Sequence, residues 1–240
     1  MLCIDSEDSI KNLIPFLSSF CIRNDESSQS NELFSIIAYL YANYKLKQLT
    51  FPLAIIKREH PDFCLLCYEQ SQSRGIEHTF STLQDYKMAQ SESRKRPEGG
   101  MLELDSYSPF WKLTKDEIDR SLRQPDEELK GKGYTGNRAE KEWSVLIKNA
   151  IHKKTKLLNK KHFEKYSSNE LIIEDDSNVR RGIKLNKALD FLTNHIENYF
   201  SSPYALKFDK IHIISRNNFV CDILSKTEIV TLPKFNSWLL

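Results

Sequence analysis

The chain has 240 residues and a formal net charge of +2; 40% of its residues are hydrophobic and 28% are charged. This length supports one sizeable core or two small ones, and the charge is too small to indicate nucleic-acid binding by itself. Five cysteines at irregular spacing favour a reduced intracellular setting over a disulfide framework. The acidic first eight residues are unlike a signal peptide, and no apolar run has membrane-spanning length, so we expect a cytoplasmic protein with no membrane partner.

The first quarter of the chain predicts two helices and a strand. Apolar residues follow a helical spacing over 9–22, interrupted by Pro15. Asn31 is positioned to cap a second helix that runs to about Tyr44 with an apolar inner stripe. The run 53–57 reads as a first strand.

A β-hairpin is predicted next. Two apolar runs, 62–68 and 75–80, are separated by the polar stretch 69–74, as in two antiparallel strands joined by a turn. A helix that runs to about Glu92 follows, with Thr82 as its expected cap. The hairpin would therefore lie between two helices.

The remaining chain predicts a polar insertion and then alternating helices and strands. The insertion covers about 94–137, with a basic turn at its start and one short helix near residue 116. After it come helix 139–160, strand 171–173, helix 185–200 and strands 208–214 and 219–224. This order predicts a single domain over 1–240 of the α/β class: a three-layer sandwich with a central mixed β-sheet flanked by helices.

Two carboxylates stand on the predicted hairpin. Asp62 begins its first strand and Glu77 lies in its second. Cross-strand side chains of a hairpin approach within a few ångströms, and two carboxylates that close repel each other unless a cation lies between them. Mg²⁺ commonly takes one or two protein carboxylates and completes its shell with water and phosphate, so the hairpin predicts a Mg²⁺ site, with Mn²⁺ as an alternative ion.

Pro61, Asp62 and Glu77 together resemble the motif of the PD-(D/E)xK nuclease superfamily, over about residues 31–93. The resemblance implies a restriction-endonuclease-like fold and a Mg²⁺-dependent endonuclease that hydrolyses DNA phosphodiester bonds. Restriction, phage defence and mobile-element processing are settings of such enzymes. One position departs from the motif, because Thr79 stands where the family usually has lysine.

The resemblance also implies roles for individual residues. Asp62 and Glu77 would bind the metal, and Glu32 at the start of the preceding helix would complete its shell. Strand alternation turns Glu77 and Thr79 to the same face. Because Thr79 carries no charge, we expect a displaced lysine to assist catalysis, either Lys57 or Lys87, with Lys87 slightly favoured.

Basic residues predict where DNA binds. Arg94, Lys95 and Arg96 open the insertion, and Lys153 and Lys156 lie on one long helix, where they could follow a phosphate backbone. A solvated helix face is the simpler explanation of such lysines.

Other interpretations fit the same residues. Asp62 could cap a turn, Glu77 could be a surface residue of an edge strand, and Glu32 could be a glutamate favoured by the helix dipole. His60 and His78 flank the carboxylates, but no further ligands stand at zinc spacing. The chain could then be a catalytically inactive nuclease-fold protein that binds nucleic acid, a protein partner or a second copy of itself. It could also be an unrelated α/β interaction protein.

Overall fold

The computed structural model describes residues 1–13, 15, 28–95, 106–123, 133–177, 179, 183–200, 205–215, 218–225 and 227–233. The chain divides into two compact units. Unit 1 comprises Met1–Thr79, Ile151–Glu174 and Pro203–Leu240; unit 2 comprises Phe80–Ala150 and Asp175–Ser202. The predicted insertion at 94–137 falls within unit 2, which begins earlier, at Phe80.

One mixed eight-stranded sheet belongs to unit 1, except for its residue Phe80, which falls in unit 2. The strands lie in space in the order of the chain. The pairs β1–β2, β2–β3 and β3–β4 are antiparallel, β5–β6 is parallel, and β6–β7 and β7–β8 are antiparallel. The strands are β1 (Leu2–Ile4), β2 (Leu53–Lys57), β3 (Phe63–Cys67), β4 (Gln72–Phe80), β5 (Ser168–Glu174), β6 (Lys210–Ser215), β7 (Asn218–Cys221) and β8 (Glu228–Thr231). This sheet confirms the predicted α/β class with a central mixed sheet.

Six helices lie in the described ranges. They are α1 (Glu7–Lys11) and α3 (Ser28–Lys45) in unit 1, α4 (Gln84–Arg94), α5 (Lys115–Ser121) and α7 (Leu185–Phe200) in unit 2, and α6 (Arg138–Leu158), which contributes residues to both units. None of these helices has the length and apolar character needed to cross a bilayer.

Two predicted helix starts were wrong. Capping by Asn31 predicted that this helix begins at Glu32, but α3 begins at Ser28. Helix α4 has Leu83 at its N-cap, not Thr82. The Thr82 hydroxyl instead donates to the backbone oxygen of Asp176 at 3.1 Å. The hydroxyl that was expected to cap α4 therefore makes a contact with a residue far along the chain.

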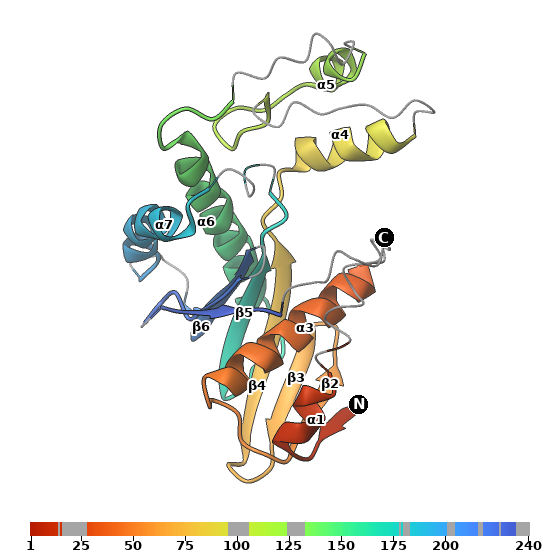
Figure 1. Ribbon diagram of the computed structural model, residues 1–240, viewed down its shortest axis with the longest axis vertical. Helices are drawn as coiled ribbons and strands as arrows, with labels where there is room; N and C mark the ends of the chain where they lie inside the picture. The colour runs from red at the N-terminus through yellow and green to blue at the C-terminus, as the bar shows by residue number, and fades with distance from the viewer. Residues whose placement is uncertain are drawn as a thin grey trace. The chain divides into compact units, whose positions relative to one another are not determined.

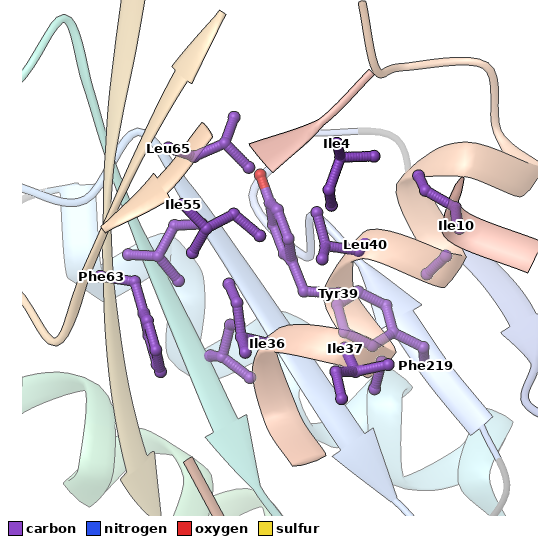
Figure 2. Close-up of a cluster of buried hydrophobic side chains, with 14 of the residues drawn as sticks. Ile4, Ile10, Ile36, Ile37, Tyr39, Leu40, Ile55, Phe63, Leu65 and Phe219 are labelled. Carbon is purple, nitrogen blue, oxygen red and sulfur yellow. The ribbon is translucent and has the colours of Figure 1, made fainter. Parts of the chain in front are cut away.

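Helix α3 lies across one face of the sheet (Figure 1). Its buried stripe packs against alternate residues of the strands, because every second side chain of a strand points to the same face. Figure 2 shows this core. Its members include Ile36, Ile37, Tyr39 and Leu40 of α3, Ile55 of β2, Phe63 and Leu65 of β3, Ile76 of β4 and Phe219 of β7.

The opposite face of the sheet contacts the end of α6 that belongs to unit 1. Glu77 lies between Ile76 and His78 in β4, so it points away from α3, and its carboxylate is bonded by Lys154 of α6. Unit 1 therefore has helices against both faces of its sheet. The predicted division of β4, with Glu77 on one face and Ile76 and His78 on the other, agrees with these contacts.

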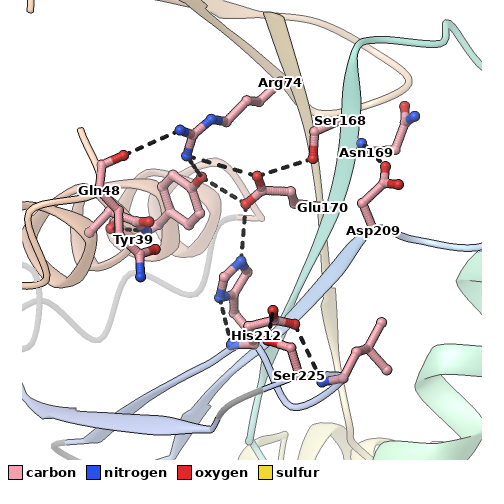
Figure 3. Close-up of polar contacts among 12 residues, drawn as sticks. Tyr39, Gln48, Arg74, Ser168, Asn169, Glu170, Asp209, His212 and Ser225 are labelled. Carbon is pink, nitrogen blue, oxygen red and sulfur yellow. Dashed lines mark hydrogen bonds and ion pairs between the residues drawn. The ribbon is translucent and has the colours of Figure 1, made fainter. Parts of the chain in front are cut away.

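A buried polar network crosses the α3 face (Figure 3). The carboxylate of Glu170 in β5 accepts hydrogen bonds from the Tyr39 hydroxyl at 2.8 Å and pairs with the His212 ring at 3.0 Å. The Arg74 guanidinium lies 3.9 Å from the same carboxylate and donates to Tyr39 and to the backbone oxygen of Gln48. The network ties α3, β4, β5 and β6 together.

Candidate catalytic and metal-binding site

Asp62 immediately precedes β3, and it contacts residues of both neighbouring strands, His78 of β4 and Lys57 of β2. Phe63 pairs with Ile76, so the antiparallel register continued by one residue places Asp62 opposite Glu77. The backbone N–H of His78 donates to Oδ2 of Asp62 at 2.7 Å, and Nζ of Lys57 lies 3.9 Å from Oδ1. The two carboxylates predicted to share a site are therefore cross-strand neighbours.

Glu77 is more deeply buried than Asp62, with 0% of its surface exposed. Its Oε1 accepts a hydrogen bond from Nζ of Lys154 at 2.5 Å. Its Oε2 is buried and has no hydrogen-bond partner among the described residues. A buried carboxylate oxygen without a partner carries a large desolvation cost, which a cation placed against it would offset.

The electrostatics of Glu77 reflect both burial and its charged neighbours. Burial raises the pKa of Glu77, and the negative charge of Asp62 raises it further. Lys154 and His60 lower this pKa, but the pKa stays above the usual value for glutamate. Ionising Glu77 is thus harder in the folded chain than in the unfolded chain, and a further positive charge beside the carboxylate would make it easier.

Lys154 is a candidate site residue that the sequence analysis did not single out. It lies on α6 in phase with Ile147, Ile151 and Leu158, all of which are buried, and its own side chain is only 17% exposed. A lysine in the apolar stripe of an amphipathic helix needs a buried anion as a partner. That position on the stripe was the available signal, although it does not identify Glu77 as the partner.

Glu32 is linked to the site through Lys57. Its carboxylate bonds to Nζ of Lys57, which also approaches Asp62. Among the described residues, no three His, Cys, Asp or Glu side chains are grouped so that they could hold a metal, so Glu32 does not form such a group with Asp62 and Glu77. Two carboxylates are enough for Mg²⁺, which keeps several of its waters.

The two lysines predicted as catalytic substitutes occupy different places. Lys57 belongs to unit 1 and approaches Asp62. Lys87 belongs to unit 2, where its Nζ lies 4.6 Å from the centre of the Phe80 ring. Thr79 is half-buried two residues beyond Glu77, on the same face of the strand. The lysine bonded to Glu77 is Lys154, and this contact makes Lys154 the better candidate.

The predicted DNA-binding residues divide between the two units. Lys153 and Lys156 are exposed on the part of α6 that belongs to unit 1. Arg94 and Lys95 are exposed at the end of α4 in unit 2, where Lys95 also pairs with Glu92 at 2.7 Å. Arg96 lies outside the described residues.

Gly75 in β4 allows close packing beneath the site. A Cβ atom added there would lie 2.5 Å from Cδ2 of Tyr166 and 2.9 Å from Cγ of Pro61, the residue before Asp62. Because ring atoms of tyrosine and proline yield little, we expect Gly75→Ala to lower the free energy of unfolding by about 1–3 kcal/mol, measured by urea unfolding. Gln72→Ala, at an exposed position of the same strand, is the control and should change stability by less than about 0.5 kcal/mol. Equal stability of the two variants would contradict this packing.

Comparison of the chain with protein-family models, with characterised proteins and with solved structures gave no match. The family resemblance of Pro61, Asp62 and Glu77 therefore stays a prediction. The geometry described above carries the functional proposal.

Proposed function

We propose that the chain is a Mg²⁺-dependent nuclease that hydrolyses DNA phosphodiester bonds with a site of the PD-(D/E)xK type. One observation carries the proposal: the fully buried Glu77 has one carboxylate oxygen bonded by Lys154 and the other without a partner in the described residues. The β3–β4 register, continued by one residue, places this glutamate opposite Asp62. An acid pair with an adjacent lysine is the set that the resemblance requires. Lys154 would supply the positive charge that is missing at the motif position occupied by Thr79.

The order of elements supports the proposal. Helix α3 precedes the antiparallel strands β2, β3 and β4, and further helices and β5 follow. A helix before the three strands and another after them is the order that the resemblance implies. The catalytic lysine would then come from α6, beyond the insertion, in place of the end of β4.

Asp62 and Glu77 fit a hard divalent cation. Oxygen is the ligand atom that Mg²⁺ prefers, and the unpartnered Oε2 of Glu77 is an available donor beside Asp62. When bound, Mg²⁺ would supply a Lewis acid that activates a water and offsets charge on the phosphate. The N–H of His78 fixes the carboxylate of Asp62 in place, so this ligand is preorganised.

Side chains around the carboxylates would stabilise charge, bind water and contact the DNA. The Lys154 ammonium is held beside Glu77, where it would stabilise the negative charge that develops on the phosphate in the transition state. Thr79 could donate a hydrogen bond to a water on the same face, but it cannot neutralise charge. Lys153 and Lys156, exposed on the same helix, would contact the DNA backbone.

The direct test is cleavage of plasmid and single-stranded DNA in the presence of Mg²⁺ or Mn²⁺. The parent protein should cut at least one substrate, and Asp62→Asn should not, while both bind DNA equally. Asp62→Asn keeps the size of the side chain and removes its charge, so it tests the metal ligand and not the fold. If the parent binds DNA and cuts neither substrate with either ion, the chain is a non-catalytic nucleic-acid-binding protein.

Metal binding should stabilise the folded protein in a pH-dependent way. Because the pKa of Glu77 is raised, the metal-free fold loses stability as the pH rises from the usual glutamate range through that pKa. Protons compete with the metal for the same carboxylates, so Mn²⁺ should bind more weakly in acid. At a hundredfold excess over Kd near neutral pH, Mn²⁺ should stabilise the parent by about 2–3 kcal/mol.

Thermal unfolding with and without Mn²⁺, at one acid and one neutral pH, measures this effect. Glu77→Gln should abolish the stabilisation. The matched control is Glu69→Gln, which changes an exposed glutamate in the turn of the same hairpin and should keep the full effect. Equal stabilisation of the parent at the two pH values would exclude these carboxylates as the ligands.

A further inference from the structure

A polar cavity lies close in sequence to the candidate site, and His60 in its lining is two residues before Asp62. It measures about 500 Å³ and is lined by Arg58, Glu59, His60, His162 and Glu164, all of unit 1. Two chain segments form it: the connection between β2 and β3, and the segment that follows α6. The backbone N–H of Glu164 donates to the backbone oxygen of His60 at 3.1 Å, so the two segments are joined at this point.

The two histidines have the separation of a pair that shares one metal ion. Their ring centres lie 5.5 Å apart, with the ring planes at 50° to each other. With Zn–N bonds of about 2.0–2.1 Å and a tetrahedral angle at the ion, two imidazole centres lie roughly 5–5.5 Å apart. Nδ1 of His60 is buried and has no hydrogen-bond partner among the described residues.

The composition of the cavity selects the class of ligand. The lining holds two carboxylates, Glu59 and Glu164, against one guanidinium, that of Arg58, and this excess of negative charge opposes the binding of an anion such as phosphate. Imidazole nitrogen suits Zn²⁺, Ni²⁺ and Cu²⁺, whereas Mg²⁺ prefers oxygen. We therefore propose that His60 and His162, with a carboxylate from Glu59 or Glu164, form a binding site for a transition-metal ion of the Zn²⁺ class, separate from the Asp62–Glu77 site.

The two histidine rings of this site already have the required separation, and the third ligand is supplied by movement of an exposed side chain. No group of three ligands is preset in the part of the chain that the structure describes. His162, Glu59 and Glu164 are exposed, so their side chains can rotate without repacking the core. Water would fill the remaining position, as in open zinc sites.

Such an ion would affect the neighbouring carboxylates. His60 is two residues before Asp62, and His162 is eight residues after Lys154. An ion bound to both histidines would tie the segment that positions Asp62 to the segment that follows α6. Its role would be to fix the geometry of the site, a role that does not require the chain to be a nuclease.

Calorimetric titration of the metal-free protein with Zn²⁺ tests the proposal without DNA. The titration uses an Asp62→Asn, Glu77→Gln background, which removes the oxygen site, and also the parent protein. Both should bind Zn²⁺ at the histidine site, and His60→Ala or His162→Ala should weaken that binding at least about tenfold. His152→Ala, on α6 and outside the cavity lining, is the control and should leave Zn²⁺ affinity unchanged.

Two results would overturn the proposal. One is loss of Zn²⁺ binding in the Asp62→Asn, Glu77→Gln background while that variant keeps its thermal transition, because the ion would then belong to the carboxylates. The other is unchanged affinity in His162→Ala, whose exposed side chain can be removed without unfolding the protein. Co²⁺ substitution adds a spectroscopic check: a thiolate charge-transfer band would place the ion on a cysteine and would also overturn the proposal.

Discussion

Lys154→Ala should lower the rate of DNA cleavage by about a hundredfold to a thousandfold, the usual loss when one preorganised charge contact to a transition state is removed. The side chain is only 17% exposed and its ammonium is bonded to Glu77, so water or a neighbouring lysine cannot easily replace it. Mn²⁺ affinity should not fall, because the variant removes a cation that competes for the Glu77 carboxylate. Single-turnover cleavage and calorimetric Mn²⁺ titration measure the two quantities separately.

A second variant makes the test specific to the position of the charge. Thr79 faces the same side of β4 as Glu77, so Thr79→Lys in the Lys154→Ala background should restore part of the activity. Lys153→Ala changes the adjacent exposed lysine of α6 and should only weaken DNA binding and its salt dependence. Cleavage by Lys154→Ala at the parental rate would exclude Lys154, and loss of cleavage in Lys87→Ala instead would restore the original prediction.

Local patterns predicted the part of the site that lies on the hairpin. The apolar runs on either side of a polar turn predicted β3 and β4, although β4 begins at Gln72, three residues earlier than expected. The alternation of a strand then placed Glu77 on the opposite face from Ile76, because a period of two residues follows from backbone geometry alone. The hairpin pattern and this alternation were enough to predict that Asp62 lies across from Glu77.

The third member of the candidate site depends on a contact between residues far apart in the chain. Lys154 is 77 residues from Glu77, and no local pattern identifies which strand an amphipathic helix will cover. Strands β1 and β8 were missed for a related reason. They have three and four residues and lie at the two edges of the sheet, so a neighbouring strand, and not their own sequence, defines them.

The buried network around Glu170 joins residues far apart in the chain, so local sequence patterns could not predict it. We expect the largest effect on stability from a substitution in this network. Glu170→Gln should lower the free energy of unfolding by about 3 kcal/mol at neutral pH, because it removes the anion that Arg74 and His212 face inside the protein. Burial alone would raise the pKa of Glu170. The hydrogen bond and charge of His212, the charge of Arg74 and the hydrogen bond from Tyr39 outweigh burial and lower this pKa to about 2.

This pKa fixes the direction of the pH dependence. A carboxylate whose pKa falls from 4.5 to about 2 on folding contributes about 3 kcal/mol of stability above its unfolded pKa, and the contribution is lost as the pH falls from about 4.5 towards 2. Urea unfolding followed by circular dichroism should therefore show that the parent loses stability over this range and that Glu170→Gln loses about 3 kcal/mol less. The exposed Glu69→Gln should behave like the parent at every pH. If Glu170→Gln and the parent share one urea midpoint at neutral pH, the network does not stabilise the fold, and Glu170 is held in place by the packing of β5 between its neighbours alone.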